Sequence, residues 1–103
     1  MLIVAGRARF DSAADLDAVL AAGETMIAET RKEAGCLDYT YARDIAEENT
    51  MRIWELWTDQ AALDSHFQAP HMAAFNAALG KVTIAAVDVK IYEVAATRDL
   101  MVS

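Results

Sequence analysis

The chain has 103 residues, of which 55% are hydrophobic, and its sixteen acidic and nine basic residues give a formal net charge of -7. This length suits one domain with its own core, and the charge disfavours nucleic acid or an anionic membrane as a partner. The apolar opening, residues 1–5, is too short for a signal peptide or a membrane span, and Cys36 is the only cysteine. We therefore expect a soluble, cytoplasmic protein without an internal disulfide.

The first third of the chain predicts a strand followed by a helix. Residues 2–10 alternate loosely and carry β-branched side chains early, as a strand does. Asp11 and Ser12 follow as candidates for the helix N-cap, and apolar residues then recur at helical spacing. We expect this helix to end near Glu33, with Gly35 as a left-handed C-terminal residue.

The rest of the chain predicts a hairpin, two helices and a last strand. Residues 37–43 and 50–57 are aromatic-rich runs on either side of a polar turn, which is typical of a β-hairpin. Asp59 caps a short helix, and Pro70 stands at the first turn of another. Residues 86–94 alternate as a further strand before a polar tail.

The order β-α-β-β-α-α-β predicts an α+β fold of the ferredoxin-like, split β-α-β kind, with a four-stranded antiparallel sheet and helices on one face. The third strand has two apolar sides, because Ile53 and Trp57 point one way while Trp54 and Leu56 point the other. A second copy of the chain is the simplest cover for the other face, so we expect a homodimer through the sheet face. The alternative is one exposed tryptophan on a monomer.

Three motifs fall in order along this pattern: E-x-G-C-x-x-Y at residues 33–39, E-x-W-x-D-x-x-A-L at 55–63, and H-x-x-x-x-H-x-x-x-F at 66–75. With these motifs the chain resembles the antibiotic biosynthesis monooxygenase family. The resemblance covers residues 2–95 of a single domain over 1–103 and leaves 96–103 as a C-terminal tail. It implies a dimeric α+β barrel in which two sheets pack together.

The same resemblance implies several activities. Family members include cofactor-independent monooxygenases of phenols, hydroquinones and polyketide aromatics, haem-degrading enzymes, a sugar-phosphate isomerase and proteins without known activity. The haem-degrading branch requires an asparagine, a tryptophan and an iron-binding histidine at positions that are Gly6, His66 and Asn76 here. All three differ, so the resemblance argues against haem breakdown.

His66 is the candidate catalytic residue, because an imidazole titrates near neutral pH and can take a proton from a phenol. Its alternative role is that of a surface or hydrogen-bonded core histidine. Trp57 and Tyr41 are candidates for an aromatic substrate pocket, although aromatic residues at strand spacing are also typical of a core. Glu55 is either a pocket carboxylate with a raised pKa or, as we favour, the partner of Arg7, Arg43 or Arg52.

His71 and Phe75, from the third motif, are further candidates for contact with a substrate. Two histidines without a convincing third ligand make a weak metal site, so we expect neither a metal nor another cofactor. The chain also lacks a glycine-rich phosphate loop, a C-x-x-C pair and a G-x-S-x-G motif.

The leading hypothesis is a cofactor-independent monooxygenase that oxidises a small aromatic, quinol-type or polyketide-like substrate with dioxygen. The alternatives are a non-catalytic small-molecule binding or stress-response protein and an isomerase of a small hydroxyketone. The catalytic hypothesis predicts a hollow between the sheet and the helices, walled by aromatic rings and His66.

Overall fold

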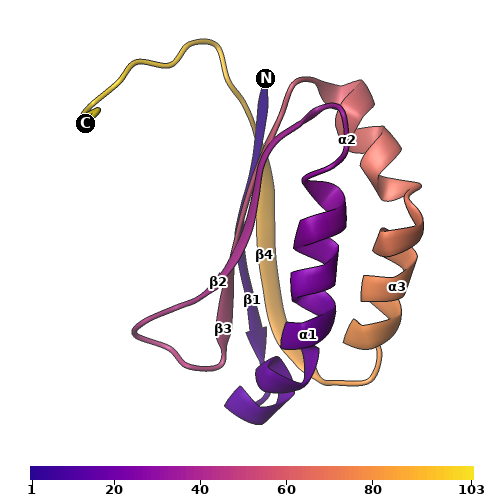
Figure 1. The fold of residues 1–103 in the computed structure, drawn as a ribbon. Helices are drawn as coiled ribbons and strands as arrows, with labels where there is room; N and C mark the ends of the chain where they lie inside the picture. Colours follow the sequence, from indigo (N-terminus) through magenta and orange to yellow (C-terminus); the bar gives the residue numbers. More distant parts are fainter.

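Four antiparallel strands form one sheet, and three helices lie against one of its faces (Figure 1). The computed structural model describes all residues, 1–103. The elements are β1 (Leu2–Phe10), α1 (Ala13–Thr30), β2 (Cys36–Arg43), β3 (Thr50–Trp57), α2 (Gln60–Phe67), α3 (Pro70–Leu79) and β4 (Ile84–Glu93). The sheet order is β2-β3-β1-β4 and every pairing is antiparallel. The predicted ferredoxin-like α+β architecture is therefore confirmed.

Local capping signals start the helices where the sequence predicts. The Ser12 hydroxyl accepts a hydrogen bond from the Asp15 backbone N–H at 3.1 Å, and so fixes the start of α1. The Asp59 carboxylate accepts one from the Ala62 N–H at 2.8 Å at the start of α2. Pro70 opens α3, where its missing N–H costs no hydrogen bond. These local features fix where α1, α2 and α3 begin.

The predicted end of α1 is wrong. The helix ends at Thr30, three residues before Glu33, and Gly35 does not have a positive φ. Gly35 is needed for a different reason: a Cβ built on it would lie only 2.2 Å from the Ala62 Cβ. The loop after α1 therefore packs directly on α2, which brings Glu33 close to the helices that follow β3.

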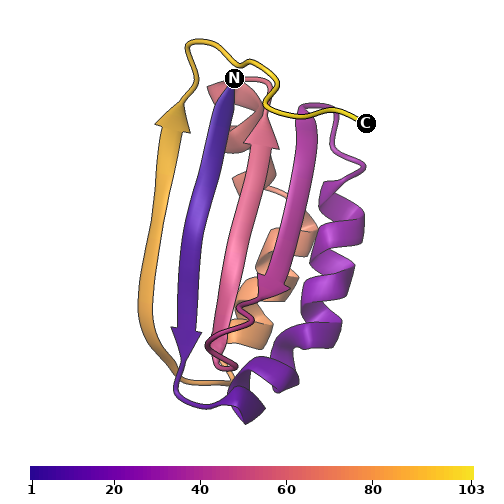
Figure 2. The ribbon, with the colours of Figure 1, turned by 90° about the vertical axis from the view of Figure 1, so that its left-hand side faces the viewer.

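Side chains on the helix-facing side of β1, β2 and β3 form most of the core together with α1. The fully buried large side chains are Phe10, Leu16, Val19, Met26, Tyr39, Trp57, Leu63 and His66. The edge strand β4 has no helix behind it (Figure 2). Its helix-side residues Val87 and Ile91 are accordingly 62% and 51% exposed. The core thus lies toward the β2–β3 side of the sheet.

The opposite face of the sheet carries no helix (Figure 1). The predicted division of β3 is confirmed, because Trp57 is buried beneath the helices while Trp54 is 41% exposed on the other face. Tyr92 of β4 is exposed on that face as well. None of the three helices combines the length and the apolar character that crossing a lipid bilayer requires.

Candidate functional site

Three aromatic rings from three elements pack together beneath the helices. Tyr39 of β2 and Trp57 of β3 point to the helix side of the sheet, and His66 lies in the last turn of α2. The His66 ring centroid lies 4.8 Å from that of Trp57 and 5.3 Å from that of Tyr39. Each of the three residues is at most 1% exposed. The His66 ring is therefore held rigidly by its neighbours.

A single carboxylate oxygen joins the two histidines of the chain. Glu33 Oε2 lies 2.8 Å from His66 Nδ1 and 2.7 Å from His71 Nε2. Glu33 lies in the loop after α1, and His71 lies in the first turn of α3. The contact therefore ties together the ends of three helices. We call these three residues, Glu33, His66 and His71, the Glu–His–His cluster.

The cluster fixes the tautomer of His66 when its ring is neutral. A carboxylate accepts hydrogen bonds, so His66 Nδ1 carries the hydrogen and donates it to Glu33. The other ring nitrogen, Nε2, is then an unprotonated acceptor, and it is buried without any hydrogen-bond partner. An imidazole oriented by a carboxylate through one nitrogen, with the other nitrogen free, is the arrangement of a general base.

Glu55 is a buried carboxylate without an arginine partner. It is 8% exposed, and its Oε1 accepts a hydrogen bond from the Trp57 indole N–H at 2.9 Å. The pKa of Glu55 is raised to about 7. Burial is the largest cause, the Trp57 hydrogen bond partly offsets it, and the negative charge of Glu33 adds to it.

The predicted ion pair of Glu55 is wrong, because none of the three arginines reaches it. Arg43 pairs with Asp17, and Arg52 pairs with Asp44 at 2.9 Å. Arg7 is exposed on β1 and forms no salt bridge. Of the alternative, a pocket carboxylate with a raised pKa, the structure bears out the raised pKa, but Glu55 is a core carboxylate that lines no cavity.

Tyr41 packs beside Tyr39, and Phe75 packs on Tyr41. The Tyr41 ring stacks on Phe75 of α3 with a centroid distance of 5.4 Å and an interplanar angle of 22°. Its hydroxyl shares a hydrogen bond with that of Tyr39. Burial raises the pKa of both tyrosines, so both hydroxyls stay protonated at neutral pH. Tyr41 can accordingly orient a polar group of a ligand, but it does not serve as an anion.

A cavity of about 170 Å³ opens between α1 and the β2–β3 hairpin, and we call it the Tyr41 groove. It is lined by Val19, Leu20, Gly23, Glu24, Ile27, Tyr41 and Met51. No cavity of the structure is lined by His66, Trp57 or Phe75. The predicted hollow walled by His66 is therefore wrong: the rings of Tyr39 and Trp57 fill the space beside the imidazole.

Sequence reasoning identified most of these residues but not their arrangement. Trp57, Glu55 and His66 do come together, and Tyr41 with Phe75 lies beside them. His71 reaches the same place through Glu33, which we had not considered as a site residue. Glu33 is the first residue of the E-x-G-C-x-x-Y motif, and its carboxylate can accept hydrogen bonds from two histidines at once.

Comparison with known proteins agrees with this fold. The family model described as "Antibiotic biosynthesis monooxygenase" matches residues 1–78. An uncharacterized protein of Synechocystis sp. is 35% identical over 81 residues, and the match covers 79% of this chain and 55% of that protein. The chain thus spans about half the length of that relative. YcnE of Bacillus subtilis, provisionally named a monooxygenase, is 30% identical over 70 residues, with 68% of this chain and 74% of YcnE covered.

Solved structures show the same architecture. A crystal structure of an antibiotic biosynthesis monooxygenase superimposes with a TM-score of 0.82 at 25% identity, and covers 93% of this chain and 100% of that one. A Deinococcus radiodurans protein, provisionally named in the same family, gives a TM-score of 0.82 at 25% identity over 98% of this chain and 99% of its own. On the family match, the identities and the shared fold, this chain belongs to the antibiotic biosynthesis monooxygenase family.

Proposed function

We propose that the protein is a homodimeric, cofactor-independent monooxygenase that oxidises a small phenol, quinol or polyketide-like aromatic compound with dioxygen. Family membership supports the reaction class. The observation that carries the proposal is His66, whose Nδ1 is oriented by Glu33 while its Nε2 is left free. The single Cys36 favours a reducing compartment, and we propose a cytoplasmic location for the one-domain chain.

The size and lining of the Tyr41 groove support a substrate with one aromatic ring. An apolar protein cavity of ~150 Å³ is large enough to bind benzene. The Tyr41 groove measures about 170 Å³ and has mainly apolar walls. Tyr41 contributes the polar contact, because its protonated hydroxyl can donate a hydrogen bond to a substrate oxygen. A phenol bound there would lie with its hydroxyl beside the Tyr41–Tyr39 pair.

The chemistry needs a base and no external reductant. Removing the phenol proton places negative charge on the ring, and the ring then gives its electrons to dioxygen. One oxygen atom ends in the substrate as a quinone carbonyl and the other leaves as water, so that a phenol plus dioxygen gives a benzoquinone plus water. In the proposal His66 Nε2 takes the proton. The imidazole is 1% exposed, so the substrate has to displace a neighbouring ring to reach it.

Oxygen uptake with a panel of naphthols and hydroquinones tests this proposal. We expect uptake by the wild-type protein, and a loss of about 100-fold or more in kcat/KM for His66→Gln, because a lost general base costs 10²–10⁴-fold. Tyr41→Phe removes only the hydroxyl and should raise KM more than it lowers kcat.

No uptake with any compound of the panel would overturn the oxygenase. Saturable thermal stabilisation by the same compounds without turnover would then favour the alternative of a non-catalytic binding protein. Turnover that persists without oxygen would favour an isomerase. Unchanged activity in a folded His66→Gln protein would remove His66 from the reaction.

The exposed sheet face supports the proposed homodimer. Trp54 and Tyr92 give that face two large exposed aromatic side chains, and Lys90 pairs with Asp88 beside them at 2.9 Å. Aromatic residues at the centre of an interface often carry most of its binding energy. We therefore propose that two copies pack through this face and bury Trp54 of each copy.

We expect the wild-type protein to have twice the 11.2 kDa mass of one chain in solution. Trp54→Glu should weaken association by about 30-fold or more, because it removes an interfacial aromatic side chain and buries a charge. Ile45→Glu, in the fully exposed turn between β2 and β3, is the matched control and should leave the mass unchanged. Light scattering across a dilution series measures both. A monomeric wild type, or a Trp54→Glu protein as dimeric as the wild type, would contradict the sheet-face dimer.

A further inference from the structure

The Glu–His–His cluster has the composition of a metal site. Glu33, His66 and His71 each offer one ligand atom, and these atoms all lie within 4.8 Å of one another. We propose that the cluster binds one divalent transition-metal ion, such as zinc or cobalt, through His66 Nδ1, His71 Nε2 and a Glu33 carboxylate oxygen. The test of this inference needs no turnover. An ion on Nδ1 of His66 would leave the ring hydrogen on Nε2, so the ion-bound protein could not use that nitrogen as the base of the proposed oxygenation.

The donor set selects the class of ion. Two imidazole nitrogens and one carboxylate oxygen suit zinc, cobalt, nickel or ferrous iron. Calcium and magnesium prefer oxygen ligands throughout, so they fit the cluster poorly. Three protein ligands leave at least one further position for water or a small anion. The acidic chain, with its formal net charge of -7, also favours a cation over an anion.

An ion requires all three ligand side chains of the cluster to rearrange. The two nitrogens now lie 2.8 and 2.7 Å from the shared Glu33 oxygen. Tetrahedral ligands with bonds of ~2.0–2.1 Å to the metal are separated by roughly 3.3 Å, so the carboxylate has to move outward by about half an ångström. Glu33 can make this movement, because it lies in a loop and its side chain is 18% exposed. The two histidine nitrogens lie within 4.8 Å of one another and also have to approach to roughly 3.3 Å, so the two imidazole side chains have to turn toward the ion.

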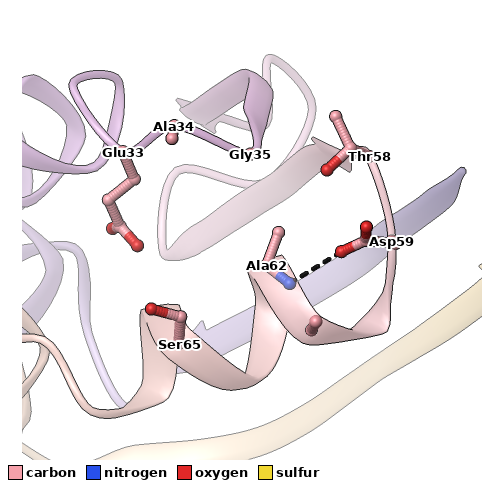
Figure 3. A pocket seen from close by; sticks show the side chains of 8 residues that line it. Glu33, Ala34, Gly35, Thr58, Asp59, Ala62 and Ser65 are labelled. Atoms are coloured by element: carbon pink, nitrogen blue, oxygen red, sulfur yellow. Dashed lines mark hydrogen bonds between the residues drawn. The ribbon is translucent and has the colours of Figure 1, made fainter.

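The cluster is open to solvent on the side of Glu33. A surface hollow of about 500 Å³ is lined by Glu33, Gly35, Thr58, Asp59 and Ser65, among others. Figure 3 shows the Glu33 carboxylate pointing toward Ser65 across this hollow. A hydrated ion can approach the carboxylate by this route. The opposite side is closed, because His66 is buried against Trp57 and Tyr39.

The same contacts without an ion form a hydrogen-bonded clasp between three helix ends. An ion would take the place of the two hydrogens that now lie between the histidines and Glu33, and each neutral ring would then carry its hydrogen on its other nitrogen, Nε2 of His66 and Nδ1 of His71. The clasp already gathers the three ligand atoms within 4.8 Å of one another. Such preorganisation favours binding, since little order has to be created when the ion arrives.

Titration of the metal-free protein with Co²⁺ or Zn²⁺ tests this proposal. We expect one Co²⁺ per chain with visible absorption of nitrogen- and oxygen-bound cobalt, displacement of Co²⁺ by Zn²⁺, and a rise in Tm with Zn²⁺. His71→Ala and Glu33→Gln should each weaken binding by more than ~10-fold. Both side chains are partly exposed, so these variants should still fold.

Cys36→Ser is the matched control, because Cys36 is the only thiol and lies three residues from Glu33. It should bind Co²⁺ as the wild type does. A wild-type protein that shows no saturable binding of either metal would overturn the proposal, and the cluster would then be only a hydrogen-bonded contact between helix ends. Equal binding by a folded His71→Ala protein, or a loss of binding in Cys36→Ser, would overturn it as well.

Discussion

Replacing Gly35 by alanine should lower the free energy of unfolding by about 2–3 kcal/mol, the upper part of the range for an overpacked core. The new Cβ would lie 2.2 Å from the Ala62 Cβ and 3.0 Å from the Thr58 hydroxyl oxygen. Neither neighbour is the end of a long, flexible side chain, so the loop itself has to move away from α2. Thermal unfolding should show a Tm lower by about 10 °C or more. The shifted loop should also pull Glu33 away from the histidines.

Two further variants make this prediction specific. Gly80→Ala is the matched control, because a Cβ there meets nothing closer than 3.5 Å and Gly80 already has a helical φ of -66°. It should be neutral or slightly stabilising. Ala62→Gly in the Gly35→Ala protein removes the opposing methyl group and should restore part of the lost stability. Equal Tm values for Gly35→Ala and Gly80→Ala would show that the stability of the protein does not depend on the close approach of Gly35 to Ala62.

Replacing Glu55 by glutamine should make the protein more stable at pH 8 and leave it about as stable near pH 4. In the unfolded chain Glu55 ionises near its ordinary pKa of 4.5, whereas burial raises the pKa in the folded protein to about 7. Between these values the folded state holds more protons than the unfolded state, so the stability of the wild type falls as pH rises. Above pH 7 the full cost of a buried carboxylate is present.

The expected gain for Glu55→Gln at pH 8 is about 1–3 kcal/mol. The glutamine side-chain oxygen can still accept the hydrogen bond of the Trp57 indole, so the variant keeps that contact. Urea unfolding of both proteins across this pH range measures the difference. If the difference in free energy of unfolding between the two proteins stays constant with pH, Glu55 has the same pKa in the folded and unfolded states.

Local sequence patterns predicted the fold well, because each signal acts over a few residues. The alternation in 2–10 and 50–57 gave both central strands their observed bounds, and Ser12, Asp59 and Pro70 begin the helices through contacts within one turn. The two apolar sides of β3 were also visible from its alternation. The end of α1 was not predicted, since Gly35 is set by its contact with Ala62, which is distant in the sequence.

The contacts within the site were harder to predict. Glu33 lies 33 residues from His66 and 38 from His71, so only the folded chain brings them to one oxygen. Glu55 was assigned to an arginine because surface charges usually pair, but its side chain points into the core. Its partner there is Trp57, two residues along the same strand face. Cavities depend on the packing of whole side chains, so their positions could not be read from residue types.

The proposed role of His66 as a base requires that its Nδ1 hydrogen is donated to Glu33 and that Nε2 carries no hydrogen. Histidine-ring nitrogen NMR of the metal-free protein measures this directly, and the chain has only two histidines to assign. With neutral rings, we expect His66 to carry its hydrogen on Nδ1 and His71 to carry its hydrogen on Nε2. A hydrogen on Nε2 of His66, or a His66 ring that exchanges freely between tautomers, would contradict the account.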